Sequence, residues 1–347
     1  MDAVHIIEVG FGCKLPPLFR MSGPHLTLVT GATGHLGANL VRRLVQQGER
    51  VRVLLRPSSD PRAVDGLDIE RAIGDIRTPV ALANAVKGCT RVYHCAARIS
   101  ITSGGEREIY ETNVLGTRNV LAAAASAGVS RVVVTGSFSA VGHHPDRPSD
   151  ERDPFDPFVK ALPYERSKAA VEHECLKAVA DGQEVVIAIS CAIIGPNDFK
   201  PSRMGRVIQD FARGRMPAYI PGGFEFVAAR DIVQGHLLAM ERGRPGQRYI
   251  FSTEFVTVDT LMQWLEEITG KPRPRLRLPP PVMAAIASVA SPVMSTFAPH
   301  RPQRLTPGAI HLLRMGRRAD CTKAKQELGY APTSVKEAVR EAHQWFH

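Results

Sequence analysis

Short apolar runs alternate with amphipathic segments along the first half of the chain. The apolar runs cover residues 25–30, 51–55, 69–75, 91–97, 131–137 and 184–190, and segments 38–48, 79–88 and 106–128 between them have the pattern of helices. Strands that are apolar almost throughout are buried on both faces, which requires a parallel sheet with helices on each side. The pattern therefore predicts an α/β fold, a Rossmann-type doubly wound parallel sheet.

The regular alternation weakens after residue 190, where Pro- and Gly-rich connections join shorter elements. We expect a Rossmann domain over residues 23–190 and a smaller, mixed part over 191–347 that mainly binds substrate and carries the C-terminal helices. Residues 1–22 are expected to be a leader that is disordered or not native, because acidic residues and the lack of an early basic residue make a poor signal peptide.

Residues 282–299 form an apolar stretch, but it is only about one helix long and Pro292 interrupts it. We expect a buried lid helix rather than a membrane span. Attachment to a membrane surface is the alternative.

A glycine-rich segment, TGATGHLG, follows the first predicted strand and opens the first predicted helix. Glycines at these places allow a tight turn and close approach of the backbone to a diphosphate, while the helix N-terminus supplies positive dipole. An ordinary strand-to-helix turn is the alternative. The residues expected to bind a dinucleotide here are Gly31, Thr33, Gly34, His35, Leu36 and Gly37.

A second motif, Tyr164-Glu165-Arg166-Ser167-Lys168, places a tyrosine and a lysine one helical turn apart on the same face. An ammonium near a phenol stabilises the tyrosinate and lowers its pKa, so Tyr164 is expected to exchange a proton with a substrate oxygen near neutral pH. Taken alone, the motif is weak, because many surface helices carry Tyr and Lys at this spacing.

The T-G-x-x-G-x-x-G spacing, the Y-x-x-x-K motif and segments such as ETNVLGTRNVLAAA and AKQELGYAP resemble extended short-chain dehydrogenase/reductases. The resemblance runs from Leu26 to near the C-terminus. These segments look like those of the dihydroflavonol 4-reductase, 3β-hydroxysteroid dehydrogenase and hopanoid-associated epimerase/reductase group.

The resemblance implies a nicotinamide dinucleotide, with Asp75 and Ile76 at the adenine and Ala96 and Ala97 beside the nicotinamide ribose. Arg56 stands at the end of the second strand, where an enzyme that uses NAD carries Asp or Glu. Its planar fork suits a 2′-phosphate, so we expect NADP(H) to be favoured over NAD(H). Arg52 points the other way along the strand and is expected to be solvated or to serve packing.

The same resemblance completes a catalytic set of Ser137, Tyr164, Lys168 and Asn113. Ser137 would hold the reacting oxygen, and Lys168 would also bind the nicotinamide ribose. Asn113 has two open interpretations, a catalytic one near Lys168 and a structural one within its helix. The residues expected to contact substrate are Phe138, Ser139 and Ile194, although a turn-stabilising hydroxyl is an equal explanation for Ser139.

The composition limits the partners. The net charge is +10, but the basic residues are dispersed, so we expect no nucleic-acid partner, and no stable membrane insertion. Six cysteines without a C-x-x-C pair indicate neither a metal site nor a disulfide framework and fit a reducing cytoplasm. Relatives often pair through two long helices, which in a homodimer of this chain would be those that contain Asn113 and Tyr164.

Together these features predict an NADP(H)-dependent short-chain dehydrogenase/reductase, a ketoreductase that reduces a ketone or oxidises the alcohol of a small apolar molecule such as a secondary-metabolite intermediate. The apolar segments Ala192–Ile194 and Val227–Ala229 replace the polar anchors common in sugar-nucleotide enzymes. A nucleotide-sugar epimerase or dehydrogenase is the first alternative, with cations from Arg203, Arg206, Arg213 and Arg215. A non-catalytic NADP-sensing protein is the second. The natural substrate, direction and stereochemistry stay open.

Overall fold

The computed structural model describes residues 25–100, 104–156, 162–279, 313 and 315–347. The expected leader and the apolar stretch 282–299 lie outside the described residues.

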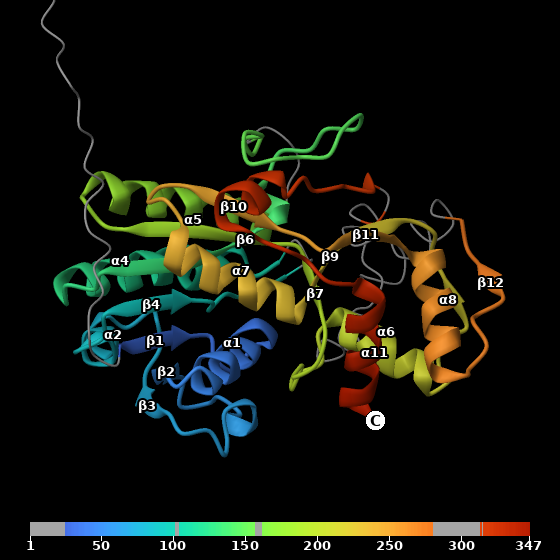
Figure 1. Ribbon diagram of the computed structural model, residues 1–347, viewed down its shortest axis with the longest axis horizontal. Helices are drawn as coiled ribbons and strands as arrows, with labels where there is room; N and C mark the ends of the chain where they lie inside the picture. The colour runs from blue at the N-terminus through green and yellow to red at the C-terminus, as the bar shows by residue number, and fades with distance from the viewer. Residues whose placement is uncertain (1–24, 101–103, 157–161, 280–312, 314) are drawn as a thin grey trace, which may run out of the picture.

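A seven-stranded parallel sheet forms the centre of the molecule (Figure 1). Its strand order is β10-β6-β5-β4-β1-β2-β3, so the chain starts near the middle and winds outward in both directions. The predicted doubly wound α/β fold is confirmed. The strands of this sheet are β1 (Leu26–Thr30), β2 (Arg50–Leu55), β3 (Glu70–Ile73), β4 (Arg91–His94), β5 (Arg131–Ser137), β6 (Val185–Ser190) and β10 (Arg248–Phe251).

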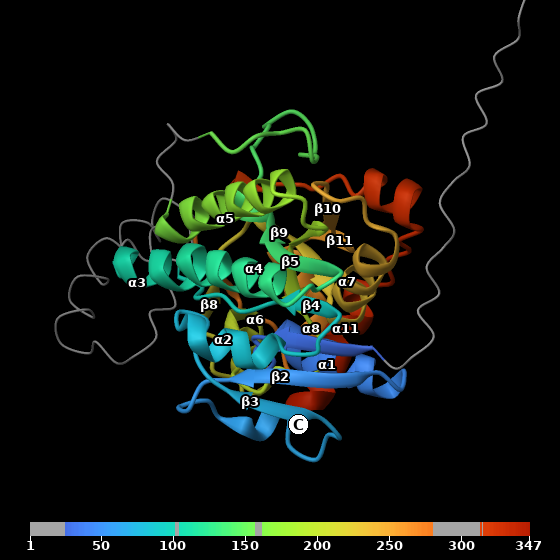
Figure 2. The same ribbon diagram turned by 90° about the vertical axis from the view of Figure 1, so that its left-hand side faces the viewer.

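Helices cover both faces of this sheet. One face carries α2 (Pro79–Val86), α4 (Gly116–Ser126) and α5 (Pro163–Ala180), which lie side by side (Figure 2). The other face carries α1 (His35–Gln46) and α7 (Ala229–Arg242), which pack against each other (Figure 1). Because helices cover both faces, every residue of β1 is buried, and buried positions do not alternate with exposed ones along this strand.

The predicted long helix over residues 106–128 is not a regular α-helix. It consists of α3 (Glu106–Tyr110), a π-helical segment (Glu111–Leu115) and α4. Short π-segments inside helices are frequent at functional sites, and this one contains Asn113.

The chain after residue 190 builds a smaller unit and also returns to the main sheet. Strand β10 pairs with β6, and α7 covers the sheet, so part of this region completes the Rossmann body. The smaller unit has a three-stranded sheet in the order β11-β9-β7 and a two-stranded sheet of β12 and β8. Its elements are β7 (Ala192–Ile194), α6 (Arg203–Ala212), β8 (Ala218–Tyr219), β9 (Gly223–Ala228), β11 (Glu254–Thr257), α8 (Val258–Thr269), β12 (Leu276–Arg277) and α11 (Val335–Phe346).

Each part has its own apolar core. The larger core lies between the seven-stranded sheet and its helices. The smaller core lies among β7, β9, α6, α8 and α11, and includes Ile194, Phe211, Phe226 and Leu265. Within the described residues, no helix combines the length and the apolar character needed to span a membrane.

Candidate functional site

The glycine loop lies between β1 and α1 and has the backbone geometry that a close ligand requires. Gly31 has a φ of 72°, and a Cβ there would stand 2.6 Å from the backbone nitrogen of Ala96. A Cβ on Gly37 would stand 2.2 Å from the carbonyl oxygen of Gly31. Gly34 is the residue before α1, and no side chain caps this end of the helix. The first backbone N–H groups of α1 therefore lack a side-chain acceptor.

The other predicted residues of this loop have different roles. Leu36 is buried in the core, and Thr33 and His35 are half-buried. The His35 Nε2 atom lies 3.0 Å from the Pro196 carbonyl oxygen, so this side chain joins the loop to the segment after β7. Burial lowers the pKa of the His35 imidazole.

The predicted adenine and phosphate residues lie at the ends of β2 and β3. Arg56 is exposed directly after β2. The Asp75 carboxylate accepts hydrogen bonds from Arg77, which hold its pKa below the ordinary value, and the charge of Arg56 adds to this effect. Arg52 binds Glu70 and two backbone carbonyls, so the interpretation of Arg52 as a packing residue agrees with its contacts.

The turn after β4 is organised by a buried hydrogen-bond chain. The His94 Nδ1 atom lies 2.7 Å from Thr30 Oγ1, and His94 Nε2 lies 2.9 Å from Thr117 Oγ1. Burial and the nearby Lys168 lower the pKa of His94 to about 3, so its imidazole is neutral. The half-buried Ala96 and the exposed Ala97 follow this anchored residue.

Ser137 and Tyr164 come together from separate elements. Ser137 ends β5, Tyr164 lies in the first turn of α5, and the Ser137 hydroxyl lies near enough to the phenol to influence its pKa. The Ser137 hydroxyl also lies 2.8 Å from the hydroxyl of Ser139. The structure therefore places two hydroxyls and a phenol at the carboxyl edge of the sheet.

Lys168 follows one turn later and its side chain is only 5% exposed. Its ammonium donates a 2.7 Å hydrogen bond to the carbonyl oxygen of Thr135. Burial lowers the pKa of Lys168 to about 8.

The expected lowering of the Tyr164 pKa is wrong for this arrangement of side chains. Burial raises the pKa of the phenol, and the nearby Ser137 hydroxyl offsets only part of this rise. The physical reason is desolvation, because the phenol has lost water and the Lys168 ammonium is directed to the Thr135 carbonyl.

Asn113 is 1% exposed and has a full set of partners. Its Oδ1 accepts the Arg98 N–H at 2.7 Å, and its Nδ2 donates to the Arg98 carbonyl and to Ser167 Oγ. Asn113 thus ties the turn after Ala97 to the helix that carries Tyr164 and Lys168. These contacts are those of a residue that positions the site.

The three predicted substrate residues are not gathered in one place. Ser139 lies beside Ser137, and Phe138 is buried under a guanidinium from the C-terminal segment. Ile194 is 1% exposed and belongs to the core of the smaller unit.

That guanidinium belongs to Arg317, which was not predicted as a site residue. Its central carbon lies 4.8 Å from the centroid of the Phe138 ring, and it also donates to the carbonyl oxygen of Val141. Arg317 follows Tyr164 by more than 150 residues and belongs to no motif that would have indicated it.

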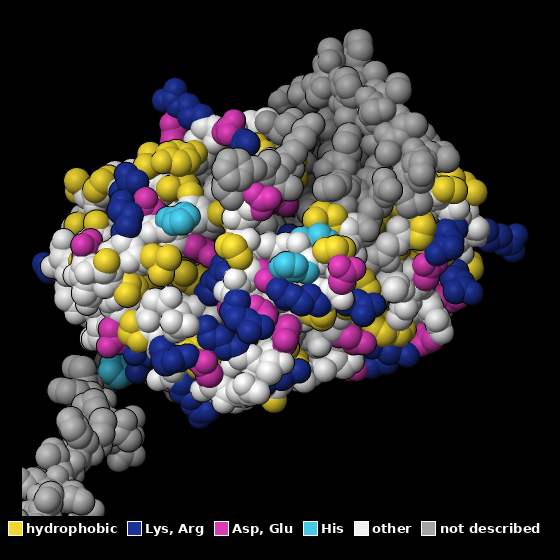
Figure 3. Space-filling view, turned by 90° about the horizontal axis from the view of Figure 1, so that it is seen from above, with side chains coloured by type: hydrophobic (Ala, Val, Ile, Leu, Met, Phe, Trp, Pro, Cys, Tyr) yellow, Lys and Arg dark blue, Asp and Glu magenta, His cyan; other side chains and the backbone are white. Residues whose placement is uncertain are grey.

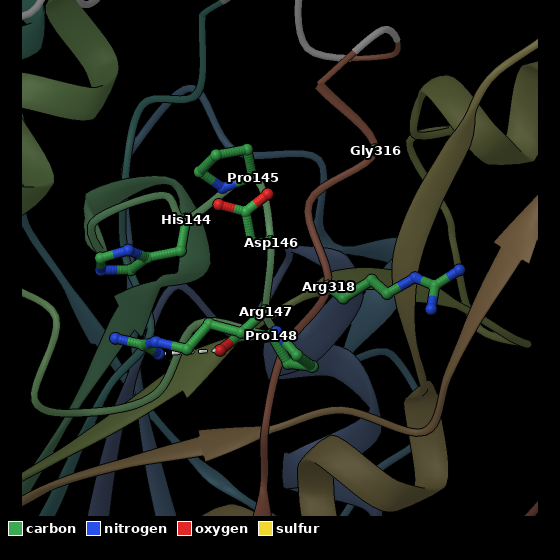
Figure 4. A pocket seen from close by; sticks show the side chains of 7 residues that line it. All are labelled: His144, Pro145, Asp146, Arg147, Pro148, Gly316 and Arg318. Carbon is green, nitrogen blue, oxygen red and sulfur yellow. Dashed lines mark hydrogen bonds between the residues drawn. The ribbon is translucent and has the colours of Figure 1, made fainter.

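The neighbours of Arg317 line a surface pocket of about 300 Å³ (Figure 4). The pocket forms where residues 144–148 run beside residues 316–318, and Arg147 pairs with Asp153 at its edge. Figure 4 shows His144 and Arg147 directed to one side and Arg318 to the other. The central carbon of Arg318 lies 5.0 Å from the Phe255 ring centroid, whereas Arg317 lies over Phe138. The two neighbouring arginines therefore point to opposite sides of their extended segment.

Charges of both signs are interspersed on the surface. On the face in Figure 3, the described residues show Lys and Arg side chains mixed with Asp and Glu.

The described residues fit a nicotinamide dinucleotide. The tight glycine turn before α1, the uncapped start of α1 and the exposed Arg56 would hold its diphosphate and ribose, while Ser137 and Lys168 lie further along the same sheet edge.

Comparisons with known proteins agree with this fit. Residues 27–251 match the model of the NAD dependent epimerase/dehydratase family. The chain is 48% identical to sterol demethylase protein B of Methylococcus capsulatus, over 92% of this chain and 98% of that protein. It is 36% identical to a putative dihydroflavonol 4-reductase of Synechocystis, over 92% and 93% of the two chains.

A more distant relative and a solved structure extend the comparison. The chain is 25% identical to the mouse protein named sterol-4-alpha-carboxylate 3-dehydrogenase, decarboxylating, over 94% of this chain and 95% of that protein. The crystal structure of gox2253 superposes with a TM-score of 0.80 at 34% identity, over 92% and 97% of the two chains. This chain belongs to the NAD-dependent epimerase/dehydratase family, the extended short-chain dehydrogenase/reductases, and is an enzyme of the oxidoreductase type.

Proposed function

We propose that this chain is an NADP(H)-dependent oxidoreductase of the cytoplasm that acts on a ring hydroxyl, or on the corresponding ketone, of an apolar sterol-like molecule. The observation that carries the proposal is the placement of Ser137 at the end of β5 near Tyr164 of α5, with the buried Lys168 one turn further along that helix. The names of the relatives with sterol substrates support the substrate class.

In this proposal the bound nicotinamide supplies or accepts the hydride. Ser137 holds the substrate oxygen, and Tyr164 donates a proton to that oxygen during reduction or accepts one during oxidation. The Lys168 ammonium binds the ribose and completes the positive environment around the phenol. Asn113 keeps the turn after β4 and helix α5 in place.

The preference for NADP(H) rests on Arg56. Its guanidinium is exposed directly after β2, and no acidic residue stands beside it in the segment Leu54–Ser59. A 2′-phosphate would pair with this fork, whereas NAD(H) has no group at that position that needs a cation.

The proposal is tested by a parallel activity screen of the purified chain. We expect oxidation of NADPH with 3-ketosteroids and reduction of NADP⁺ with 3β-hydroxysteroids. UDP- and GDP-sugars, followed by epimer formation, form the other arm. Epimerisation without net use of cofactor, together with inactivity on all steroids, would contradict the proposal.

One observation favours a second candidate, a nucleotide-sugar enzyme. Arg203 and Arg206 lie together in the first turn of α6, and burial with the neighbouring Arg206 charge lowers the pKa of Arg203 to about 10. Two adjacent cations would suit a diphosphate. The epimerisation arm of the screen distinguishes this candidate.

We also propose a homodimer through the face that α4 and α5 form together. These helices pack side by side, and Tyr110 and Leu176 are about half exposed near this face. Large apolar side chains at such a position suit burial against a second copy. Light scattering of the wild type and of Leu176→Glu would report the dimer and its loss.

A further inference from the structure

Arg317 carries a charge that the described residues do not neutralise. Its Nε atom is buried and has no hydrogen-bond partner, while its Nη2 atom donates to the Val141 carbonyl. Among the described residues, no carboxylate forms an ion pair with it. The carboxylate that raises the pKa of Arg317 is Glu165, whose Oε2 already accepts the Leu162 N–H at 2.7 Å.

This situation differs from that of the neighbouring arginines. Arg147 forms an ion pair with Asp153, and Arg318 lies over Phe255 at the exposed pocket. Arg317 is directed inward, and burial lowers its pKa. A buried cation without a counter-charge costs free energy, and an anion that enters beside it recovers that cost.

Arg317 lies near the residues that follow Ser137 and Tyr164 in the sequence. Its guanidinium stacks on Phe138, which follows Ser137 directly, and its electrostatic partner Glu165 follows Tyr164 directly. The guanidinium therefore lies beside the two segments that carry Ser137 and Tyr164. Cys191, after the end of β6, also contributes to its surroundings, which places the guanidinium over the carboxyl edge of the sheet.

We propose that Arg317 determines substrate specificity by binding a carboxylate that the substrate carries next to the carbon with the reacting oxygen. The inference rests on the proposed function, and it assigns the recognition of a hydroxy acid to one residue of the C-terminal segment. The guanidinium lies over the Phe138 ring, and its Nε–H, which has no partner, would take part in a charge-assisted pair with the carboxylate.

Two matched substrates test this assignment, a 3β-hydroxysterol with a 4α-carboxylate and the same sterol with a 4α-methyl group. For Arg317→Met we expect kcat/KM on the acid to fall roughly 10- to 100-fold, the value of a lost charge-assisted pair. On the methyl sterol we expect a change within about threefold. Arg317→Lys keeps the positive charge but lacks the planar guanidinium, so its kcat/KM on the acid should lie between those of the wild type and Arg317→Met.

Arg318→Met is the control, because this neighbour faces the surface pocket. Unchanged kinetics of Arg317→Met on the acid, or equal losses on both sterols, would overturn the assignment, since a purely structural arginine affects both substrates alike. If Arg317→Met does not fold, Arg317→Lys provides the same comparison.

If the wild type turns over neither sterol while it binds NADP⁺, the proposed function fails by itself. Calorimetric titration of the NADP⁺ complex with each sterol then decides the role of Arg317. Tighter binding of the acid by the wild type, lost in Arg317→Met, supports the assignment. Equal affinity for both sterols, or no binding of the acid, overturns it.

Discussion

Because the ammonium of Lys168 is buried, we expect the free energy of unfolding of the cofactor-free protein to change with pH in the alkaline range. In the folded chain its pKa is about 8, against an ordinary value of 10.5. The cause is burial, since the side chain is 5% exposed and its ammonium donates a hydrogen bond to the neutral carbonyl of Thr135. Lys168→Met removes the charge and retains an unbranched side chain of similar length.

The sign and size of the effect follow from proton linkage. Below pH 8 both the folded and the unfolded chain carry the proton on Lys168. Between pH 8 and 10.5 the unfolded chain keeps this proton and the folded chain has lost it, so the stability of the folded state rises with pH. The interval of 2.5 units corresponds to about 3 kcal/mol, at roughly 1.4 kcal/mol per unit.

Urea unfolding of the wild type and of Lys168→Met between pH 7 and 10.5 measures this effect. The difference in unfolding free energy should shift by about 3 kcal/mol in favour of the wild type as the pH rises, because titrations shared by both proteins cancel. Lys177→Met, on the same helix with a side chain 67% exposed, is the control and should show a nearly constant difference. A constant difference for Lys168→Met as well would refute the assignment of a buried charge.

Three further predictions concern the site. Tyr164→Phe should abolish turnover and change cofactor affinity by only a few-fold, because the hydroxyl acts on substrate; retention of most of kcat would remove Tyr164 as the acid/base group. Arg56→Ala should weaken NADPH binding about tenfold or more and NADH binding little, and tighter wild-type binding of NADH than NADPH in a titration would contradict this assignment. Gly37→Ala should weaken binding of either cofactor and cost about 1–3 kcal/mol of stability, because its Cβ would meet the Gly31 carbonyl oxygen at 2.2 Å; Gly104→Ala, with open space around it, is the control in calorimetry and thermal unfolding.

Local sequence patterns predicted many elements of this structure. The apolar runs and the glycine loop predicted the central strands and the β1–α1 turn, because strand burial and a tight glycine turn depend mainly on neighbouring residues. The Y-x-x-x-K spacing was sufficient to place Tyr164 and Lys168 on one helix face, since helical geometry is fixed over four residues. The π-helical segment around Asn113 was not predicted, because nothing in its local pattern distinguishes it from a regular helix.

The sequence by itself thus determined the fold class and the glycine loop, and it predicted the Ser-Tyr-Lys set. Only the tertiary structure decided the charge states and partners of these groups. The Tyr164 pKa is raised and the Lys168 pKa is lowered because both groups lose water when distant elements pack over them. The contact of Arg317 with Phe138 likewise joins residues that are far apart along the chain. Desolvation and long-range contacts depend on the whole fold, so no local pattern of residues could reveal them.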